Sequence, residues 1–225
     1  LILKAGHLSD PLKFQDSLTK ELKKKGVKKI FARANSFELT ENKIKNVVTN
    51  KGKMNCDYVI ICSGTGGKDL AKELGSKVSM IPAWGTSIIL KKPEIKIKLP
   101  ILIEKKGFAI VPNSNDLRVA GLVQVGGKTN NRNMKFENIL LNQVKKIFGN
   151  FKYKGIRSAT GARPLTSDSL PIVGKSPYFK NAFFNFGHGH WGMTHAPVCA
   201  NIISNLIGKR KNKINIKPYD ISRFN

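Results

Sequence analysis

Two glycine-containing runs constrain this chain more than any other feature. Residues 161–174 read Gly-Ala-Arg-Pro-Leu-Thr-Ser-Asp-Ser-Leu-Pro-Ile-Val-Gly, and residues 185–197 read Asn-Phe-Gly-His-Gly-His-Trp-Gly-Met-Thr-His-Ala-Pro. The first run places Arg163 beside a proline that stiffens the chain. The second predicts a loop between an apolar strand (183–186) and an apolar helix (198–207), where glycines admit a ligand to the backbone and the helix dipole favours an electron-rich or anionic group. Both runs therefore predict parts of a ligand site.

The spacing of these runs resembles the C-terminal signature of FAD-dependent D-amino acid dehydrogenases, members of the D-amino acid oxidase superfamily. The similarity extends to residues 6–11, to the strand that ends at Ser63 and Gly64, to residues 117–122 and to residues 219–224. It implies oxidative deamination of a D-amino acid with FAD as cofactor. The α-hydrogen would pass as hydride to flavin N5, and the imino acid would hydrolyse to a 2-oxo acid and ammonia.

The resemblance also assigns roles to residues. Arg163 would hold the substrate carboxylate through two parallel hydrogen bonds, and His190 is the second predicted catalytic residue. The glycine loop and the start of the following helix would lie against the flavin ring, where the helix dipole stabilises the charge of reduced flavin. The predicted cofactor-binding residues are Ser63, Gly64, Gly161, Gly187, His188, Gly189, Gly192, Met193 and Thr194.

Each of these residues also has a purely structural interpretation. Arg163 could cap a turn or form a surface ion pair, and the glycines after Ser63 could form a plain strand-to-helix turn. His188 and His190 have poor spacing for a metal pair, so no metal is predicted. Trp84 and Trp191 are typical of core aromatics, although Trp191 is the better functional candidate because it lies in the loop. Two of the cysteines, Cys62 and Cys199, sit in apolar context and are predicted to lie in the core.

The order of elements predicts an α/β fold: a doubly wound domain of the FAD/NAD(P)-binding type with an inserted antiparallel-sheet substrate domain. Residues 1–77 would form the first part of the FAD-binding domain, 78–153 the substrate-binding domain, and 154–225 the return segment with the C-terminal helix. No Gly-x-Gly-x-x-Gly followed by an acidic residue about 20 positions later occurs, and the chain begins at Leu1. We therefore expect that the first βαβ unit is missing and that this fragment alone is inactive.

Local patterns predict the individual elements. Asp10 and Pro11 start a helix with an apolar stripe at Phe14, Leu18 and Leu22. A small meander of strands is predicted over 27–32, 36–40, 43–49 and 53–57, then a buried parallel strand over 58–62 and a short helix to Leu74. The inserted domain is predicted to have strands at 84–90, 101–104, 108–112 and 117–123 and a helix at 134–148. Residues after 208 are predicted to be a surface extension.

Composition limits the partners. The formal net charge is +26, but 33 lysines against 7 arginines, spread over the chain, favour a solvated basic surface over a nucleic-acid interface. The expected partners are an amino acid substrate and an electron acceptor, either quinone or oxygen. Three cysteines without Cys-x-x-Cys spacing and the lack of a long apolar run predict a cytoplasmic protein, with peripheral association at the cytoplasmic face of the inner membrane as an open alternative.

The substrate is less constrained than the family. The dehydrogenase pattern usually has Thr-Pro-Asp-Gly where this chain has Thr-Ser-Asp-Ser at 166–169, and it usually lacks a second histidine at the position of His190. Related oxidoreductases that act on glycine, sarcosine or hydroxyproline-like imino acids therefore remain alternatives. A non-catalytic flavoprotein fragment and a basic nucleic-acid-binding domain are the other two hypotheses.

Overall fold

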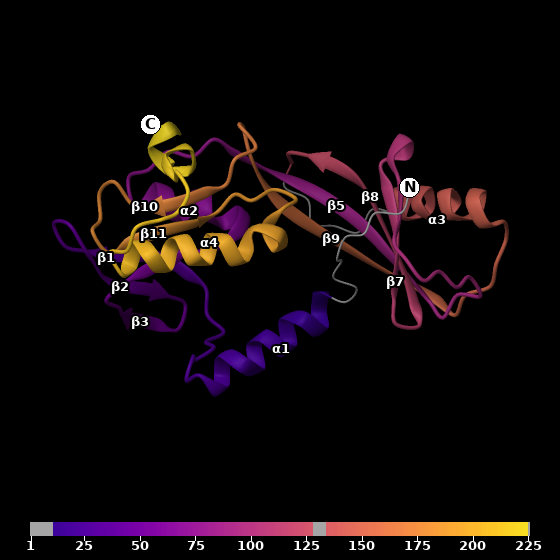
Figure 1. Cartoon of the computed structure of the whole chain (residues 1–225), viewed down its shortest axis with the longest axis horizontal. Helices are drawn as coiled ribbons and strands as arrows, with labels where there is room; N and C mark the ends of the chain where they lie inside the picture. Colours follow the sequence, from indigo (N-terminus) through magenta and orange to yellow (C-terminus); the bar gives the residue numbers. More distant parts are fainter. Residues whose placement is uncertain (1–10, 128–133, 225) are drawn as a thin grey trace. The chain divides into compact units, whose positions relative to one another are not determined.

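The computed structural model describes residues 11–127 and 134–224 (Figure 1). The chain divides into two compact units. Unit 1 comprises residues 1–30, 84–124 and 129–161, and unit 2 comprises residues 31–83, 125–128 and 162–225. The segment 6–10, with the predicted helix cap Asp10, lies outside the described residues. Within the described ranges, no helix is both long and apolar enough to cross a membrane.

Unit 2 begins with a three-stranded antiparallel meander. Its strands are β1 (Ala34–Leu39), β2 (Ile44–Thr49) and β3 (Gly52–Asn55), in that order. Three of the four predicted strands are therefore confirmed. The strand predicted over 27–32 is wrong, because these residues form no regular structure and Phe31 is 75% exposed. Their apolar side chains resemble a strand pattern, but no neighbouring strand forms a ladder with them.

The central sheet of unit 2 has the order β10-β11-β4. β11 (Ala182–Phe186) pairs antiparallel with β10 (Ile172–Lys175) and parallel with β4 (Val59–Ile61). The predicted parallel strand is thus confirmed, but its predicted burial is wrong: Tyr58 and Ile60 are 52% and 44% exposed. They are exposed because β4 is the last strand in this order, and no described strand pairs with its other side.

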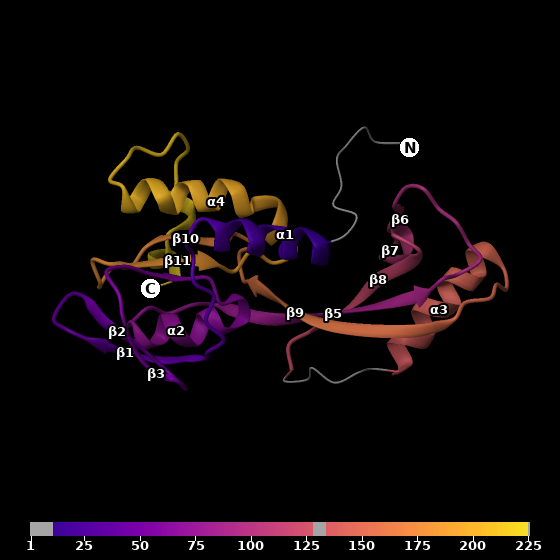
Figure 2. The ribbon, with the colours of Figure 1, turned by 90° about the horizontal axis from the view of Figure 1, so that it is seen from below.

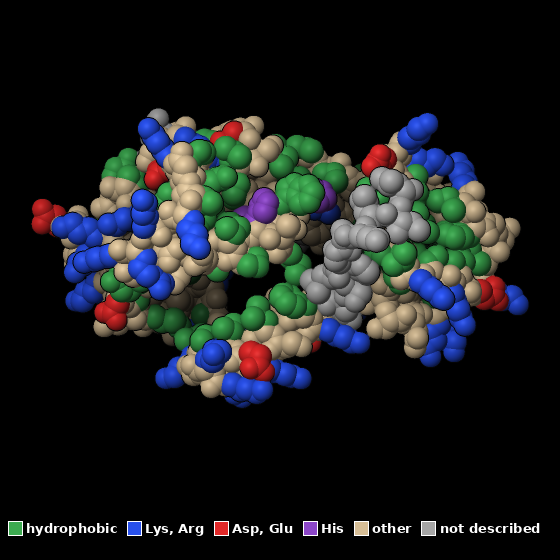
Figure 3. All heavy atoms as spheres, in the orientation of Figure 1, with side chains coloured by type: hydrophobic (Ala, Val, Ile, Leu, Met, Phe, Trp, Pro, Cys, Tyr) green, Lys and Arg blue, Asp and Glu red, His purple; other side chains and the backbone are tan. Residues whose placement is uncertain are grey.

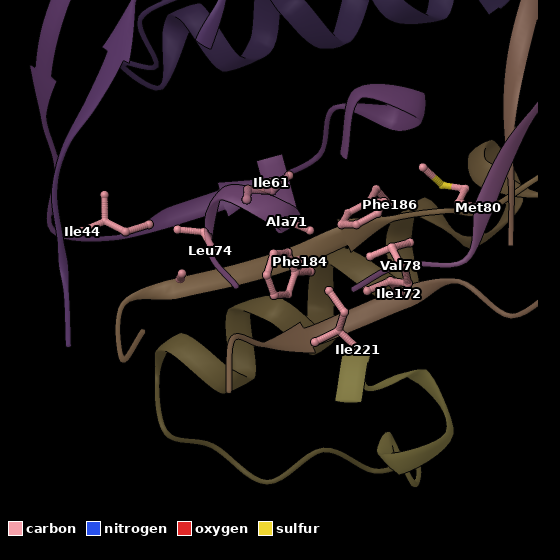
Figure 4. Packing of buried hydrophobic residues seen from close by; sticks show 11 residues of the cluster. Ile44, Ile61, Ala71, Leu74, Val78, Met80, Ile172, Phe184, Phe186 and Ile221 are labelled. Carbon is pink, nitrogen blue, oxygen red and sulfur yellow. The ribbon is translucent and has the colours of Figure 1, made fainter. Parts of the chain in front are cut away.

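Helices cover both faces of this sheet (Figure 2). On one face, Phe184 and Phe186 pack with Ala71 of α2 (Gly67–Glu73) and with Leu74, which follows the helix (Figure 4). On the other face, Phe183 packs against α4 (Gly192–Ile207) through the following buried residues of the helix: Cys199, Ile202 and Ile203. Alternate side chains of β11 therefore enter two separate cores.

The two cysteines of this unit that were predicted to lie in the core differ in burial. Cys199 is buried, as predicted, whereas Cys62 is exposed because it follows the edge strand β4.

The helix predicted to start after Pro197 begins instead at Gly192, so Pro197 lies inside it. A proline at the sixth helical position removes a single backbone hydrogen bond near the helix start, which the remaining turns of α4 tolerate.

The C-terminal segment is not a simple surface extension, which corrects that prediction. Short 3₁₀ helices at Lys217–Tyr219 and Ile221–Phe224 return to the sheet, and Ile221 is buried in the same core as Phe184 (Figure 4). Arg223 anchors the segment through a two-pronged pair with Asp168, with Nε donating at 2.6 Å and Nη2 at 3.3 Å. The prediction rested on the lysine-rich composition of the segment and overlooked its few apolar residues, which complete the core.

We expect Arg223→Met to lower the free energy of unfolding by about 1 kcal/mol at neutral pH. The Arg223 guanidinium lowers the pKa of Asp168 below its ordinary value of 3.8. A lowered folded-state pKa stabilises the protein above the ordinary value, and this contribution is lost as the pH falls below it. The difference between wild type and variant, measured by urea unfolding, should therefore stay constant from about pH 6 to about pH 5 and shrink as the pH falls below about 4. A difference that stays constant below about pH 4 as well would contradict this role for the ion pair. Lys24→Met, which removes only the exposed Lys24–Glu21 pair, serves as control.

Unit 1 contains α1 (Pro11–Lys24) and most of a five-stranded sheet with the order β6-β7-β8-β5-β9. The strands are β5 (Met80–Lys91), β6 (Ile101–Ile103), β7 (Phe108–Asn113), β8 (Asp116–Val125) and β9 (Gly155–Thr166). β6 pairs antiparallel with β7, and β7 with β8. The four predicted strands are confirmed, and α3 (Met134–Phe148) has its predicted bounds. Leu140 and Val144 of α3 join the buried residues of one sheet face.

Candidate functional site

The structure brings the two glycine-containing runs together within unit 2. Leu165 and His188 form an isolated antiparallel bridge, and the N–H of Gly189 donates a hydrogen bond of 3.0 Å to the carbonyl of Pro164. Backbone contacts thus hold the end of β9 against the loop after β11. Arg163, one residue before Pro164, is consequently placed beside this loop by the backbone itself.

A third predicted segment lies at the same end of the central sheet. Because β4 and β11 are parallel, the turn at Ser63 and Gly64 and the loop at Gly187 both follow the carboxyl ends of their strands. Ligands of doubly wound sheets bind outside the carboxyl ends of strands. The two segments are also packed together, since the ring of Phe186 lies directly against Gly67.

This packing makes Gly67 necessary. A Cβ atom at Gly67 would lie 2.5 Å from the Phe186 ring, whereas one at Gly66 would have no atom closer than 3.9 Å. Both glycines have helical backbone angles that alanine adopts without strain. Gly67→Ala is therefore expected to lower the free energy of unfolding by about 1–3 kcal/mol, and Gly66→Ala by less than about 0.5 kcal/mol. Equal effects of the two substitutions in urea unfolding would show that the contact is not strained by a methyl group.

The glycines of the loop differ in why they are needed. Gly187 and Gly189 have positive φ angles of 78° and 53°, a conformation that favours glycine. A Cβ at Gly187 would also lie 3.0 Å from the Thr166 side chain. Gly192 has no positive φ angle, and a Cβ there would make only an ordinary contact of 3.5 Å with His188. The first two glycines thus shape the loop, while Gly192 leaves open space at the start of α4.

The start of α4 offers three backbone donors. Across residues 11–127 and 134–224, no group accepts a hydrogen bond from the N–H of Gly192, Met193 or Thr194. Trp191 provides no side-chain cap, and the first turn carries no acidic residue. Unpaired amides and the positive end of the helix dipole together suit an anionic or electron-rich ligand. These three residues were predicted to contact the cofactor.

Three aromatic rings cluster around this helix start. The His195 ring lies 6.5 Å from His188 and is stacked at 6.5 Å and 25° against Trp191, which is 62% exposed. The core interpretation of Trp191 is therefore wrong. Burial, and then the neighbouring His195, lower the pKa of His188. His195 was not predicted as a site residue, although its position four residues after Trp191 on a helix places both on one face.

His188 and His190 occupy different environments. The His188 Nε2 atom is buried, and no described residue forms a hydrogen bond with it. His190 is exposed, and its pKa is lowered by partial burial and then by the positive charge of Arg163. The two predicted catalytic residues are therefore electrostatic neighbours. Figure 3 shows the described histidine side chains on the face of the molecule that carries the start of α4.

The remaining predicted residues are less distinctive. Met193 is 53% exposed, and Thr194 and Ser63 are also exposed. Gly161 lies on β9 within unit 1, and a Cβ there would meet no atom within 4 Å. The backbone therefore gives no steric reason for glycine at position 161.

A parallel strand pair with a glycine loop at its carboxyl ends is the arrangement at which α/β sheets bind ligands, and the second, antiparallel sheet is separate from it. A family model described as FAD dependent oxidoreductase (DAO) matches residues 1–206. The chain belongs to this family, and FAD is the family's cofactor.

Named relatives agree with this assignment. The chain is 25% identical to a D-amino-acid oxidase from Bradyrhizobium diazoefficiens, over 100% of this chain and 54% of the relative. It is 26% identical to a D-amino acid dehydrogenase from Rhizobium rhizogenes, over 96% of this chain and 52% of the relative. The chain thus spans about half the length of these curated relatives.

Solved structures show the same fold. The L-proline dehydrogenase from P. horikoshii superposes with a TM-score of 0.81 at 22% identity, covering 96% of this chain and 60% of that one. The glycine oxidase from Geobacillus kaustophilus superposes with a TM-score of 0.78 at 20% identity, covering 87% and 53%. The predicted α/β fold of the FAD-binding type is confirmed by these similarities.

Proposed function

We propose that this chain supplies the flavin-ring and substrate-carboxylate contacts of an enzyme that oxidatively deaminates D-amino acids. The observation that carries the proposal is the backbone pairing of the Arg163 segment with the glycine loop before α4. That pairing puts a guanidinium beside a group of unpaired amides. A planar guanidinium recognises a carboxylate through two hydrogen bonds, and amides at a helix start recognise an electron-rich ring edge.

The residues around this loop fit a flavin. Three free N–H groups at the start of α4 would face its electron-rich carbonyl edge, and the loop glycines let the backbone approach the ring. The buried Nε2 of His188 is a further polar atom that could meet a ligand. When bound, the flavin supplies the acceptor for the hydride from the substrate α-carbon. In this proposal Ser63, Gly64 and Gly161 also belong to the cofactor-binding residues.

The protein's own residues have three tasks in the proposed reaction. Arg163 would hold the carboxylate and thereby fix which face of the α-carbon is presented. The start of α4 would stabilise negative charge on the reduced cofactor. His190, with a pKa lowered by partial burial and by Arg163, favours its neutral form and would offer the substrate an uncharged hydrogen-bonding group. The imino acid product would hydrolyse in water to a 2-oxo acid and ammonia.

Related amine substrates form the second candidate. Structural neighbours include proteins described as glycine oxidase, iminodiacetate oxidase and L-proline dehydrogenase. The Thr-Ser-Asp-Ser sequence at 166–169 and His190 depart from the usual dehydrogenase pattern and favour keeping these substrates in the test. We further propose a cytoplasmic location, oxygen or a quinone as electron acceptor, and peripheral contact with the cytoplasmic membrane face in the quinone case.

The test is a titration of the full-length flavoprotein under anaerobic conditions. D-amino acids, their L-enantiomers, glycine, sarcosine and hydroxyproline are added singly, and loss of the oxidised-flavin absorbance is recorded. Bleaching by D-amino acids with release of a 2-oxo acid is the expected result. Bleaching only by glycine, sarcosine or hydroxyproline would support the second candidate, an oxidoreductase of related amine substrates. No bleaching by any of these compounds would favour a non-catalytic flavoprotein.

A further inference from the structure

Unit 1 contains a cavity between the segment that follows β5 and the hairpin formed by β7 and β8. Its volume is about 550 Å³, within the range of roughly 300–1,000 Å³ that is common for small-molecule pockets. The residues that line it lie between positions 92 and 117 and all belong to unit 1, whereas Arg163 and the glycine loop belong to unit 2. The cavity therefore shares no residue with the site proposed for the flavin and the substrate carboxylate.

One part of the cavity lining is apolar. In residues 92–98 burial alternates along the chain: Pro93, Ile95 and Ile97 are half-buried, and the residues between them are exposed. Ile95 and Ile97 pack against the core that contains Leu117, which is itself buried and lines the cavity. A ligand in the cavity would thus bury apolar surface against aliphatic side chains, which favours binding.

The backbone beside the cavity is not paired with the sheet. β6 pairs with β7 only from Ile101 to Ile103. Among the described residues, no backbone hydrogen bond joins residues 95–99 to another segment. Pro112 of β7, which also lines the cavity, has no N–H to donate. The segment therefore does not extend the sheet here, and the space between the two is left open.

The other part of the lining carries an excess of positive charge. Lys92 and Lys96 line the cavity together with Asp116. The Asp116 carboxylate already accepts hydrogen bonds from the Lys91 ammonium group at 2.5 Å and from the N–H of Lys92 at 3.2 Å. Within the described ranges, the ammonium groups of Lys92 and Lys96 form no ion pair and no hydrogen bond. Lys91 thus neutralises the acidic group, and two lysine charges are left without a partner.

Uncharged donors and a further lysine lie beside these charges. The Ser114 hydroxyl accepts a hydrogen bond of 3.4 Å from Lys13 of α1, so its own O–H can donate to a ligand. Asn115 adds a side-chain amide. A second cavity, of about 350 Å³, shares Ser114, Asn115 and Asp116 with the first and adds Lys154. These groups donate from several directions, which suits a tetrahedral phosphate, and lysine binds phosphate as a point charge.

We propose that this cavity binds a phosphate monoester with a short apolar group, with Lys92 and Lys96 at the phosphate and Ile95 and Ile97 along the apolar group. Inorganic phosphate would leave the apolar lining in contact with water. A neutral apolar compound would leave the lysine charges without a partner. The ligand therefore needs both parts, and the inference does not rest on the proposed deaminase function.

The test measures binding to the 225-residue chain by isothermal titration calorimetry. Hexyl phosphate carries both parts of the ligand, inorganic phosphate only the anionic part, and 1-hexanol only the apolar part. Lys96→Met removes one lysine of the cavity. Lys98→Met is the matched control, because Lys98 is an exposed lysine of the same segment that does not line the cavity. The control is needed because a chain with net charge +26 attracts any anion.

We expect hexyl phosphate to bind at least about tenfold more tightly than inorganic phosphate or 1-hexanol. Lys96→Met should weaken this binding by about 3- to 10-fold and Lys96→Glu by more, while Lys98→Met stays near wild type. Equal effects of the methionine substitutions at positions 96 and 98 would overturn the proposal. Equal binding of hexyl phosphate and inorganic phosphate would overturn it as well, because the apolar lining would then contribute nothing.

A further variant separates this cavity from the site proposed around Arg163. Arg163→Ala should leave hexyl phosphate binding within about twofold of wild type, because Arg163 belongs to unit 2. A loss in Arg163→Ala without a loss in Lys96→Met would assign the binding to unit 2 and contradict the proposal. Turnover of amino acids is not measured in this test, so a failure of the proposed function would leave its result unchanged.

Discussion

Replacing Arg163 in the full-length flavoprotein is expected to lower kcat/KM for D-amino acids by about 30-fold to several thousand-fold, because a charge-assisted carboxylate pair contributes roughly 2–5 kcal/mol. Arg163→Ala should be worse than Arg163→Lys, since lysine keeps the charge and loses only the two-pronged geometry. Flavin content should be unchanged in both variants. Steady-state kinetics with the flavin absorbance as active-site concentration measures the effect.

The loss should be smaller for amine substrates that lack a carboxylate. Arg157→Ala is a suitable control because it removes an exposed arginine from the same strand, β9. If Arg163 only stabilises the turn into the glycine loop, both Arg163 variants would lose similar small amounts of thermal stability and retain near-parental turnover. That result would contradict the proposal that Arg163 binds the substrate carboxylate, and with it the position proposed for the active site.

The 225-residue chain by itself is expected to lose FAD during gel filtration. The chain's one Gly-x-Gly-x-x-Gly run, at 187–192, has no acidic residue about 20 positions later. The run with its acidic residue is the element that holds the pyrophosphate and ribose of a dinucleotide. Each charge-assisted phosphate contact contributes roughly 1.5–3 kcal/mol, so losing two of them weakens binding by about 10²- to 10⁴-fold. In the proposed function, the start of α4 contacts only the flavin ring.

The absorbance spectrum after gel filtration measures this directly. The expected spectrum is that of colourless protein, and added FAD should bind no more tightly than riboflavin, because the ring contacts serve both. A stoichiometric yellow preparation would show that this chain carries its own pyrophosphate site. Full-length protein treated in the same way provides the control for losses during chromatography.

Local sequence was sufficient for elements with a clear helical or strand periodicity. The helix α1, the bounds of α3 and four strands of the five-stranded sheet follow from that periodicity, whereas β9 was not predicted as a strand. It was also sufficient to locate the glycine loop, because Gly187 and Gly189 adopt backbone angles that favour glycine. These features need no knowledge of which distant segments meet.

Other features depended on long-range pairing and were not predictable. The burial expected of Ile60 failed because β4 is an edge strand, and strand order is a property of the whole sheet. Residues 27–32 have an apolar strand pattern but no partner strand. The basic C-terminal segment returns to the sheet, where Ile221 joins the core that contains Phe184 and Arg223 pairs with Asp168, 55 residues earlier in the chain.

The candidate site shows the same division. Sequence by itself identified the Arg163 segment and the loop from Gly187 to Thr194 as ligand-binding chemistry, because residue type and spacing determine what the backbone and side chains can donate. Only the tertiary structure joined them, through the Leu165–His188 bridge, and brought the His188 ring near His195. Periodicity encodes neighbours along a helix or strand, whereas contacts between separate strands depend on how the whole chain packs.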